Sequence, residues 1–209
     1  FEKPTKGEIV LNGQKLNGSK TFVEPEKRHI GMVFQDIALF PHLSVVDNLQ
    51  FGIRSWPRPQ RDKRSGELLE LVSMSQFEKT FPHELSGGQQ QRIALARAIA
   101  PKPSLLLMDE PFSSLDVELR EQLAREVRLI LKQEKMSAIL VTHDQDEAFA
   151  MGDYICVMHQ GRVQQKDTAY NLYHNPANRF VGEFIGEGAL LPGVIADTDT
   201  ITTDLGEIT

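Results

Sequence analysis

The sequence predicts an α/β fold with parallel central strands, and two observations lead to this prediction. From residue 105 onward, short apolar runs alternate with helical segments, a pattern typical of a parallel sheet covered by helices. Between residues 41 and 82 the apolar residues instead recur with helical spacing. We therefore expect a helical subdomain, over about residues 41–100, inserted into the α/β domain.

The remaining elements follow from local patterns. Residues 7–13 are interpreted as a short strand closed by an Asn-Gly turn, and residues 30–34 form a second apolar run. Continuous apolar runs later in the chain predict strands that are buried on both faces. After Pro82 we expect, in order, a helix at 87–100, a strand at 105–108, a helix at 117–135, a strand at 138–142, a helix at 144–151, strands at 154–158 and 162–166, and a helix at 180–185.

Composition narrows the classes of function. The 209 residues carry a formal net charge of −6, which argues against a broad nucleic-acid-binding surface. We interpret the locally basic stretch at residues 54–64 as a solvated loop. The single cysteine, Cys156, lies in an apolar run and is interpreted as a buried strand residue. No apolar run approaches the roughly 18–20 residues that cross a bilayer, and no signal peptide is visible, so a soluble chain is expected.

The strongest functional signal is Leu85-Ser-Gly-Gly-Gln-Gln-Gln-Arg92. Two glycines at a helix start let the backbone approach a ligand closely. Free amide groups and the positive helix end favour an anion such as phosphate there. Ser86 can cap the helix or donate its hydroxyl to the same anion. Taken alone, the segment fits a phosphate site and a capped helix start that binds nothing equally well.

A second signal is Leu105-Leu-Leu-Met-Asp-Glu-Pro111. A strand here delivers Asp109 and Glu110 to the carboxyl end of the sheet, where α/β proteins place ligands. Adjacent carboxylates repel each other, so the pair is unfavourable unless a bound cation or a proton-transfer role offsets the repulsion. Asp109 suits a Mg²⁺ site, and Glu110 suits polarising a water molecule. The alternative is a strand end whose acids mark its exit into solvent.

Three weaker signals lie elsewhere in the chain. Gln35 follows the apolar run at residues 30–34, His143 follows the run at 138–142, and Asp116 precedes a helix. By itself His143 fits a structural histidine, and Asp116 fits a helix cap.

Taken in chain order, these signals resemble the motif series of ABC-type ATPase domains, which have a P-loop NTPase-like fold. The resemblance runs from the first residue to about residue 186. It implies ATP and Mg²⁺ as ligands. It also implies that the Ser-Gly-Gly-Gln segment of one subunit closes over ATP held by a second copy of the chain. That segment comprises Ser86, Gly87, Gly88 and Gln89.

The resemblance also implies a role for each residue of the other motifs. Glu110 would be the general base, and Asp109 would serve Mg²⁺ through water. Gln35 would sense Mg²⁺ and the attacking water. His143 would contact the γ-phosphate, and Asp116 would reach across the dimer.

The family's phosphate-binding loop, G-x-x-x-x-G-K-[ST], does not occur in the 209 residues. Residues 1–8 resemble the part of the family that lies a helix length beyond that loop, so the loop is expected before Phe1. We therefore expect an ATPase domain at residues 1–187 that lacks its N-terminal part. The 209 residues alone are expected to be inactive.

Within the family, residues 39–43 and 87–92 resemble importer ATPases that carry a C-terminal regulatory β domain. The β-branched, Thr- and Asp-rich residues 188–209 would begin that domain. Residues 184–192 resemble the ferric-iron importers most, while sugar, polyamine and sulfate remain alternative substrates. The implied partners are membrane permease subunits and, indirectly, an external solute-binding protein. The implied location is peripheral, on the cytoplasmic face of the inner membrane.

Other classes of function fit less well. A DNA-repair ATPase of this family would carry a long coiled coil between Gln35 and Ser86, where only 50 residues intervene. A ribosome-associated member would carry two sets of motifs. A purely structural module would have no use for the catalytic Glu110.

Overall fold

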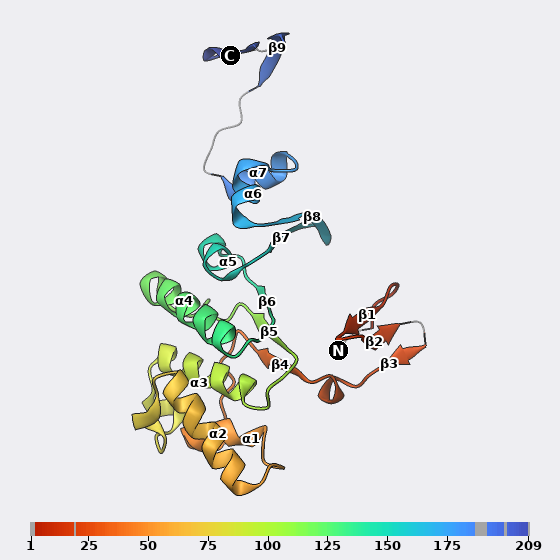
Figure 1. Ribbon diagram of the computed structural model, residues 1–209. Helices are drawn as coiled ribbons and strands as arrows, with labels where there is room; N and C mark the ends of the chain where they lie inside the picture. The colour runs from red at the N-terminus through yellow and green to blue at the C-terminus, as the bar shows by residue number, and fades with distance from the viewer. Residues whose placement is uncertain (1–2, 19, 187–191, 199, 209) are drawn as a thin grey trace. The chain divides into compact units, whose positions relative to one another are not determined.

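The computed structural model describes residues 3–18, 20–186, 192–198 and 200–208, which form two compact units (Figure 1). One unit is Phe1–Met151 and the other is Gly152–Thr209. The domain boundary expected between residues 187 and 188 touches residues 187–191, which lie outside the described residues, and it stays a prediction. None of the described helices is long and apolar enough to cross a membrane.

A small antiparallel sheet opens the first unit. Its strands are β1 (Ile9–Leu11), β2 (Gln14–Gly18) and β3 (Thr21–Phe22). Asn12 and Gly13 join β1 to β2 with φ angles of 48° and 78°. Positive φ at both central residues gives a tight turn the twist that a hairpin requires. The strand and the Asn-Gly turn expected near residues 7–13 are therefore confirmed.

The central sheet has parallel strands, as the sequence predicts, and their order in the structure is β4-β5-β6. They are β4 (Ile30–Val33), β5 (Leu105–Asp109) and β6 (Ala138–Val141). The expected burial is wrong for β6, because Ile139 and Val141 are exposed. Among the described residues β6 pairs with β5 alone, so it is an outer strand of the sheet rather than a central one.

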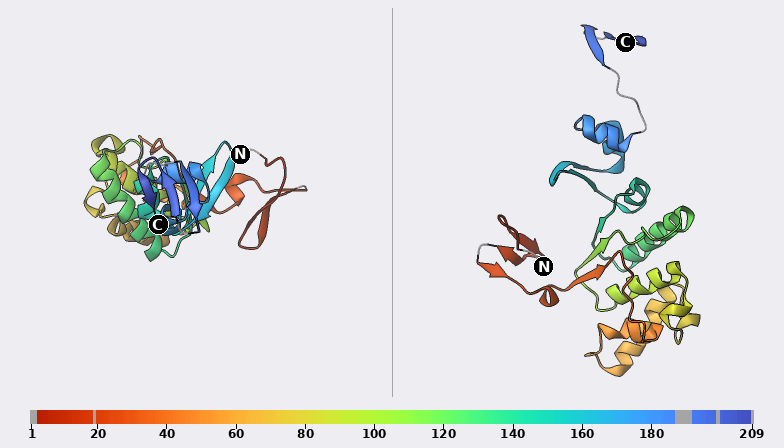
Figure 2. Two further views of the ribbon diagram at one scale, coloured as in Figure 1. Left: turned by 90° about the horizontal axis from the view of Figure 1, so that it is seen from above. Right: turned by 180° about the vertical axis from the view of Figure 1, so that it is seen from behind.

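Helices α1 to α5 complete the first unit. They are α1 (Val45–Phe51), α2 (Arg58–Leu71), α3 (Gly87–Ile99), α4 (Val117–Gln133) and α5 (Gln145–Met151). Helix α3 lies against β4, with α1 and α2 beside it (Figures 1 and 2). One hydrophobic core joins these helices to the sheet, as Leu49, Ile93, Leu106 and Leu123 illustrate. A separate helical subdomain over residues 41–100 stays a prediction, since its helices share the core of the sheet.

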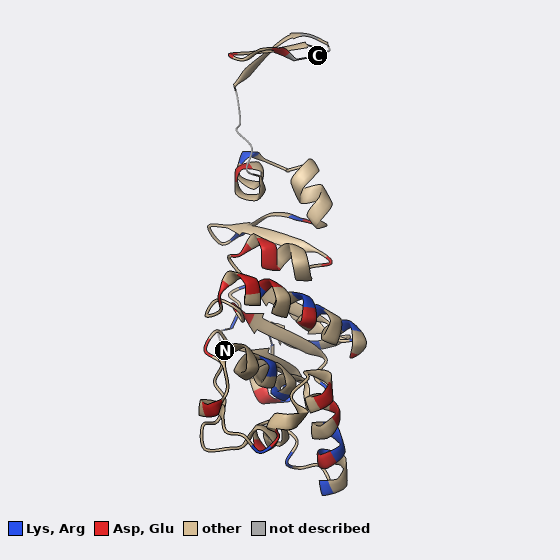
Figure 3. Ribbon diagram, turned by 90° about the vertical axis from the view of Figure 1, so that its left-hand side faces the viewer, with Lys and Arg blue, Asp and Glu red and all other residues tan. Residues whose placement is uncertain are grey.

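The basic stretch at residues 54–64 is not a solvated loop, because residues 58–64 form the first half of α2. Arg64 is buried, and its Nη2 donates to the Ile99 carbonyl at 3.1 Å and to Glu134 Oε2 at 2.9 Å. Its Nε donates to the Ala100 carbonyl at 3.4 Å. The charge pattern reveals none of these partners, which lie far along the chain. Acidic and basic residues are also interspersed along α4 (Figure 3).

The second unit begins with the antiparallel hairpin β7 (Ile155–His159) and β8 (Arg162–Asp167). Gln160 and Gly161, both with positive φ, make the expected turn. The expected burial of Cys156 is wrong, since Cys156 is exposed. In β7 the buried residue is Val157, and successive side chains of a strand point to opposite faces.

Two helices and a sheet follow the hairpin: α6 (Ala169–His174), α7 (Arg179–Ile185), β9 (Gly193–Asp197), β10 (Thr200–Thr203) and β11 (Gly206–Ile208). The helix expected at residues 180–185 is confirmed as α7. Helix α6 was not predicted, although the Thr168 hydroxyl caps it by accepting from the Asn171 amide at 3.3 Å. The three strands pair with each other in the order β11-β10-β9. Whether they begin a regulatory domain stays a prediction.

Candidate functional site

The carboxyl ends of β4, β5 and β6 meet at one edge of the central sheet. Because the three strands are parallel and in continuous register, the residues that follow them lie at a similar level. Gln35 is two residues past β4, Asp109 and Glu110 stand at the end of β5, and His143 is two residues past β6. The fold thus brings four predicted site residues from three separate segments to the same edge.

Glu110 and His143 are in direct contact, with 3.2 Å between Glu110 Oε1 and His143 Nδ1. The Glu110 amide donates to the Val141 carbonyl at 2.8 Å, and the φ of Glu110 is 43°, in the left-handed region. Such a φ is uncommon for a residue with a side chain, and it persists where the surrounding structure enforces it. The side chains are 32% and 70% exposed, respectively, so a ligand can reach both.

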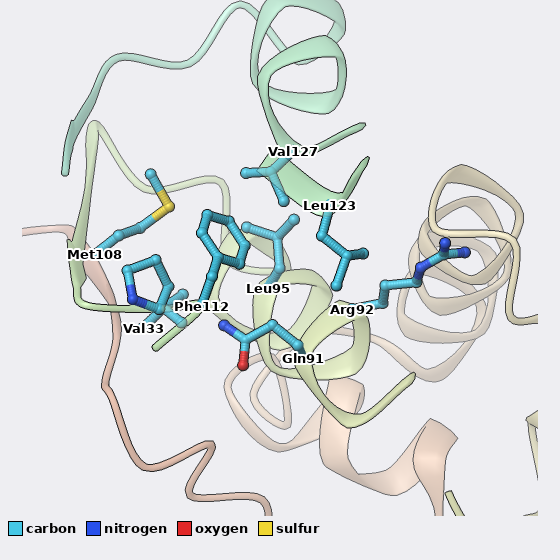
Figure 4. A pocket seen from close by; sticks show the side chains of 9 residues that line it. Val33, Gln91, Arg92, Leu95, Met108, Phe112, Leu123 and Val127 are labelled. Carbon is cyan, nitrogen blue, oxygen red and sulfur yellow. The ribbon is translucent and has the colours of Figure 1, made fainter. Parts of the chain in front are cut away.

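A small apolar pocket under this edge shows what enforces the turn (Figure 4). Phe112, two residues after Glu110, is almost fully buried and packs where β4, β5, α3 and α4 meet. The pocket is lined by Val33, Gln91, Arg92, Leu95, Met108, Pro111, Phe112, Leu123 and Val127. Burial of Phe112 therefore holds the chain in place directly after Glu110.

Asp109 and Gln35 offer oxygen ligands of the kind that Mg²⁺ prefers. Both residues are exposed at the sheet edge. Within the described ranges, no three His, Cys, Asp or Glu side chains gather into a group that could hold a metal ion. The residues fit a Mg²⁺ ion that takes one or two protein ligands and completes its shell with water and phosphate oxygens, as is usual at nucleotide sites.

The start of α3 is a capping box. The Ser86 hydroxyl accepts a hydrogen bond from the Gln89 amide at 3.4 Å, and Gln89 Oε1 accepts one from the Ser86 amide at 2.9 Å. The expected helix cap is confirmed, whereas anion binding stays a prediction. Accepting a bond does not use the Ser86 hydroxyl hydrogen, which can still be donated to an anion.

The two glycines of this segment have different surroundings. Gly88 is buried, and a Cβ there would lie 3.1 Å from Leu119 Cδ2, so glycine lets α3 approach α4 closely. Gly87 is exposed, and a Cβ there would meet Leu115 at an ordinary 3.5 Å. Of the two, Gly87 is the one whose backbone faces solvent.

Asp116 is exposed and caps α4, with its carboxylate accepting from the Leu119 amide at 3.0 Å. In the part of the chain that the structure describes, no hydrogen bond or ion pair links Ser86 or Gln89 with Glu110 or His143. The predicted residues therefore form two sets, one at the sheet edge and one where α3 and α4 begin.

Sequence reasoning missed the residues that hold His143 in place. Thr142 donates to Glu147 at 2.6 Å, and Asp144 accepts from the Glu147 amide at 3.0 Å and from Arg120 at 2.7 Å. The spacing Asp144-x-x-Glu147 at a helix start is a capping signal that could have revealed part of this arrangement. No sequence signal connects Arg120 to it.

The pKa values of Asp144 and Glu147, the two carboxyl groups beside Arg120, are shifted in opposite directions. Burial raises the pKa of Glu147, and the charge of Asp144 raises it further, against the lowering effects of Thr142 and Arg120. Burial also favours a higher pKa for Asp144, but hydrogen bonds from the Glu147 amide and from Arg120 outweigh it and lower that pKa. Asp144 is therefore the firmly ionised partner of Arg120.

Residues 1–113, more than half of the chain, match the ABC transporter family. The chain belongs to this family. It is 47% identical over 201 residues to the spermidine/putrescine import ATP-binding protein PotA of Roseobacter denitrificans, covering 95% of the chain and 54% of that protein. It is 46% identical over 209 residues to the Fe(3+) ions import ATP-binding protein FbpC of Pseudomonas fluorescens, covering 100% of the chain and 58% of that protein. The chain spans about half the length of the curated relatives it matches.

Proposed function

We propose that this chain is part of the ATP-binding and ATP-hydrolysing subunit of an ABC importer. The observation that carries the proposal is the sheet edge, where Glu110 contacts His143 beside Asp109 and Gln35. A carboxylate that is partly exposed and held by a strained backbone can take the proton of an attacking water.

Phosphoryl transfer depends on positioning and charge neutralisation more than on covalent chemistry. In the proposed site Glu110 accepts the proton of the attacking water, and His143 contacts the γ-phosphate. Asp109 and Gln35 would hold Mg²⁺, which neutralises phosphate charge when bound.

We further propose that two copies of the subunit complete each site. The separation of the predicted residues into two sets supports this proposal, since Ser86, Gly87 and Asp116 are exposed and, among the described residues, form no hydrogen bond or ion pair with Glu110 or His143. The helix start of one copy would close over ATP held by the other. ATP would then join the two copies, and hydrolysis would release them.

The 209 residues by themselves should bind Mg-ATP far more weakly than the full-length gene product and hydrolyse none. The sequence contains no G-x-x-x-x-G-K-[ST] loop, whose backbone amides and lysine hold the phosphates. Calorimetric titration of residues 1–209 with Mg-ATP measures this directly. Micromolar binding would show that the phosphate contacts come from elsewhere in these residues.

The surface that docks on a membrane permease subunit is proposed to lie in residues 36–76. The rings of Phe40 and Phe51 are in contact, with 4.2 Å between their centroids and a tilt of 36°, and Phe51 remains exposed. Leu43 and Val46 are partly exposed, whereas Leu49 is fully buried and belongs to the core. These partly exposed apolar side chains support a protein-docking role.

Cysteines placed along residues 41–47 should therefore crosslink to the permease subunits in membranes that contain the assembled transporter. The matched control is a set of cysteines along α5, Gln145–Met151, which follows β6, the strand at the opposite end of the sheet order from β4. Crosslinks confined to the α5 set would move the docking surface away from residues 36–76. In the proposed transporter the subunit is peripheral, on the cytoplasmic face of the inner membrane.

Ferric iron is the substrate that we propose, with polyamines as the second candidate. Iron is proposed because residues 184–192 resemble the ferric-iron importers; of these, residues 187–191 lie outside the described part of the structure. In addition, the iron-importing relative aligns over all 209 residues. The equally similar polyamine-importing relative keeps the second candidate open. An external solute-binding protein would supply the substrate to the permease.

Deleting the gene should abolish uptake of radioactive ferric iron and leave polyamine, sugar and sulfate uptake unchanged. Complementation with the intact gene is the control. Normal iron uptake with lost polyamine uptake would overturn the iron assignment and leave the ATPase role untouched.

A further inference from the structure

Arg120, near the start of α4, connects two loops that each carry a candidate site residue. Its Nη2 donates to the Leu115 carbonyl at 3.0 Å, and its Nη1 donates to the Asp144 carboxylate at 2.7 Å. Leu115 directly precedes Asp116, and Asp144 directly follows His143. One guanidinium therefore ties together the immediate neighbours of Asp116 and His143.

The loop that carries His143 is held by hydrogen bonds among Thr142, Asp144 and Glu147. The Thr142 hydroxyl donates to Glu147 at 2.6 Å and accepts from the Asp144 amide at 3.0 Å. The Glu147 amide donates to Asp144 Oδ1 at 3.0 Å, and Glu147 is only 3% exposed. These bonds use the polar groups on both sides of His143, while the imidazole itself remains mostly in solvent.

Arg120 faces an excess of negative charge. A small pocket beside it is lined by Val117, Arg120, Glu121, Asp144, Asp146 and Glu147. Arg120 Nε lies 3.7 Å from Glu147 Oε1 and has no hydrogen-bond partner. Without the guanidinium, the carboxylates of Asp144 and Glu147 would face each other with no cation between them, and their repulsion would loosen the loop.

We propose that Arg120 is a positioning residue for the ATP hydrolysis proposed above. It fixes the His143 loop against the Asp116 loop, so His143 is set for its phosphate contact before ATP arrives. It also transmits a displacement of Asp116, which would meet the second copy, to His143. This inference rests on the proposed function, because His143 has a phosphate to contact only in an ATPase.

The test replaces Arg120 by glutamine in the full-length gene product. A misplaced catalytic group lowers the chemical step more than substrate binding, so kcat should fall at least about tenfold while KM for ATP stays within about twofold. Arg125→Gln is the matched control, since Arg125 lies on the same helix, is exposed and, within the described residues, pairs with Glu121 only. It should retain wild-type kcat and KM.

Combining Arg120→Gln with His143→Ala separates positioning from a general loss of structure. If Arg120 acts through His143, the double variant should be no slower than His143→Ala alone. A full additional loss in the double variant would overturn the inference. So would wild-type kcat in Arg120→Gln.

A wild-type protein that does not hydrolyse ATP would instead overturn the proposed function, so the two failures are distinguishable. If Arg120→Gln unfolds, Asp144→Asn takes its place, because it removes the charged partner of Arg120 and keeps the side-chain shape. The same loss of kcat without a change in KM is expected, and an unchanged kcat would contradict the inference.

Discussion

Glu110→Gln in the full-length gene product should slow ATP hydrolysis by about a hundredfold or more while leaving Mg-ATP binding intact. Glutamine keeps the size and hydrogen-bonding shape of the side chain but cannot accept the proton of an attacking water. The contact with His143, at 3.2 Å in the structure, can persist through the amide oxygen. The loss should therefore appear in kcat.

Steady-state phosphate release and calorimetric titration with Mg-ATP measure the two quantities separately. Glu70→Gln is the matched control, since Glu70 is exposed on α2. Because ATP would be bound but not hydrolysed, the Glu110→Gln dimer should persist in ATP during size-exclusion chromatography. Wild-type turnover in this variant would remove Glu110 from the role of base.

Arg64→Met should lower the free energy of unfolding by about 3 kcal/mol, within the range for breaking a buried ion pair. The change leaves Glu134, which is mostly shielded from water, without its cation. It also leaves the Ile99 and Ala100 carbonyls, at the end of α3, without a donor. Methionine fills much of the arginine volume, so the cost reports the lost polar contacts rather than a cavity.

Urea denaturation of the 209-residue chain measures the change. Lys63→Met is the control on the same helix, because Lys63 is exposed and its ion pair with Glu67 is long, at 3.9 Å. Adding Glu134→Leu to Arg64→Met should recover part of the loss, since the unpaired carboxylate is then removed. A change no larger than that of Lys63→Met would show that the ion pair contributes nothing measurable.

The sequence by itself determined the elements whose contacts lie within a few residues. The Asn12-Gly13 turn, the Ser86–Gln89 capping box and the Asp116 cap all depend on hydrogen bonds between residues at most three positions apart. The sequence also indicated the residues at the sheet edge, but only Asp109 and Glu110 were placed there by the strand pattern. Gln35 and His143 joined them through the resemblance to the family, and the parallel register of the strands explains why all four lie at the same end of the sheet.

Only the tertiary structure decided the partners of the buried charges and the burial of the strands. Arg64 meets Glu134 across 70 positions, and Arg120 meets Asp144 across 24, so no local pattern records either pair. The apolar residues of β6 read as buried, but their exposure depends on what pairs with the strand and covers it. The role of Gly88 as a ligand contact stays a prediction, and the structure adds that its missing Cβ makes room for Leu119 of another helix. Each of these outcomes depends on packing between segments distant in the chain, and hydrophobic periodicity reports which face of an element is apolar but not what that face meets.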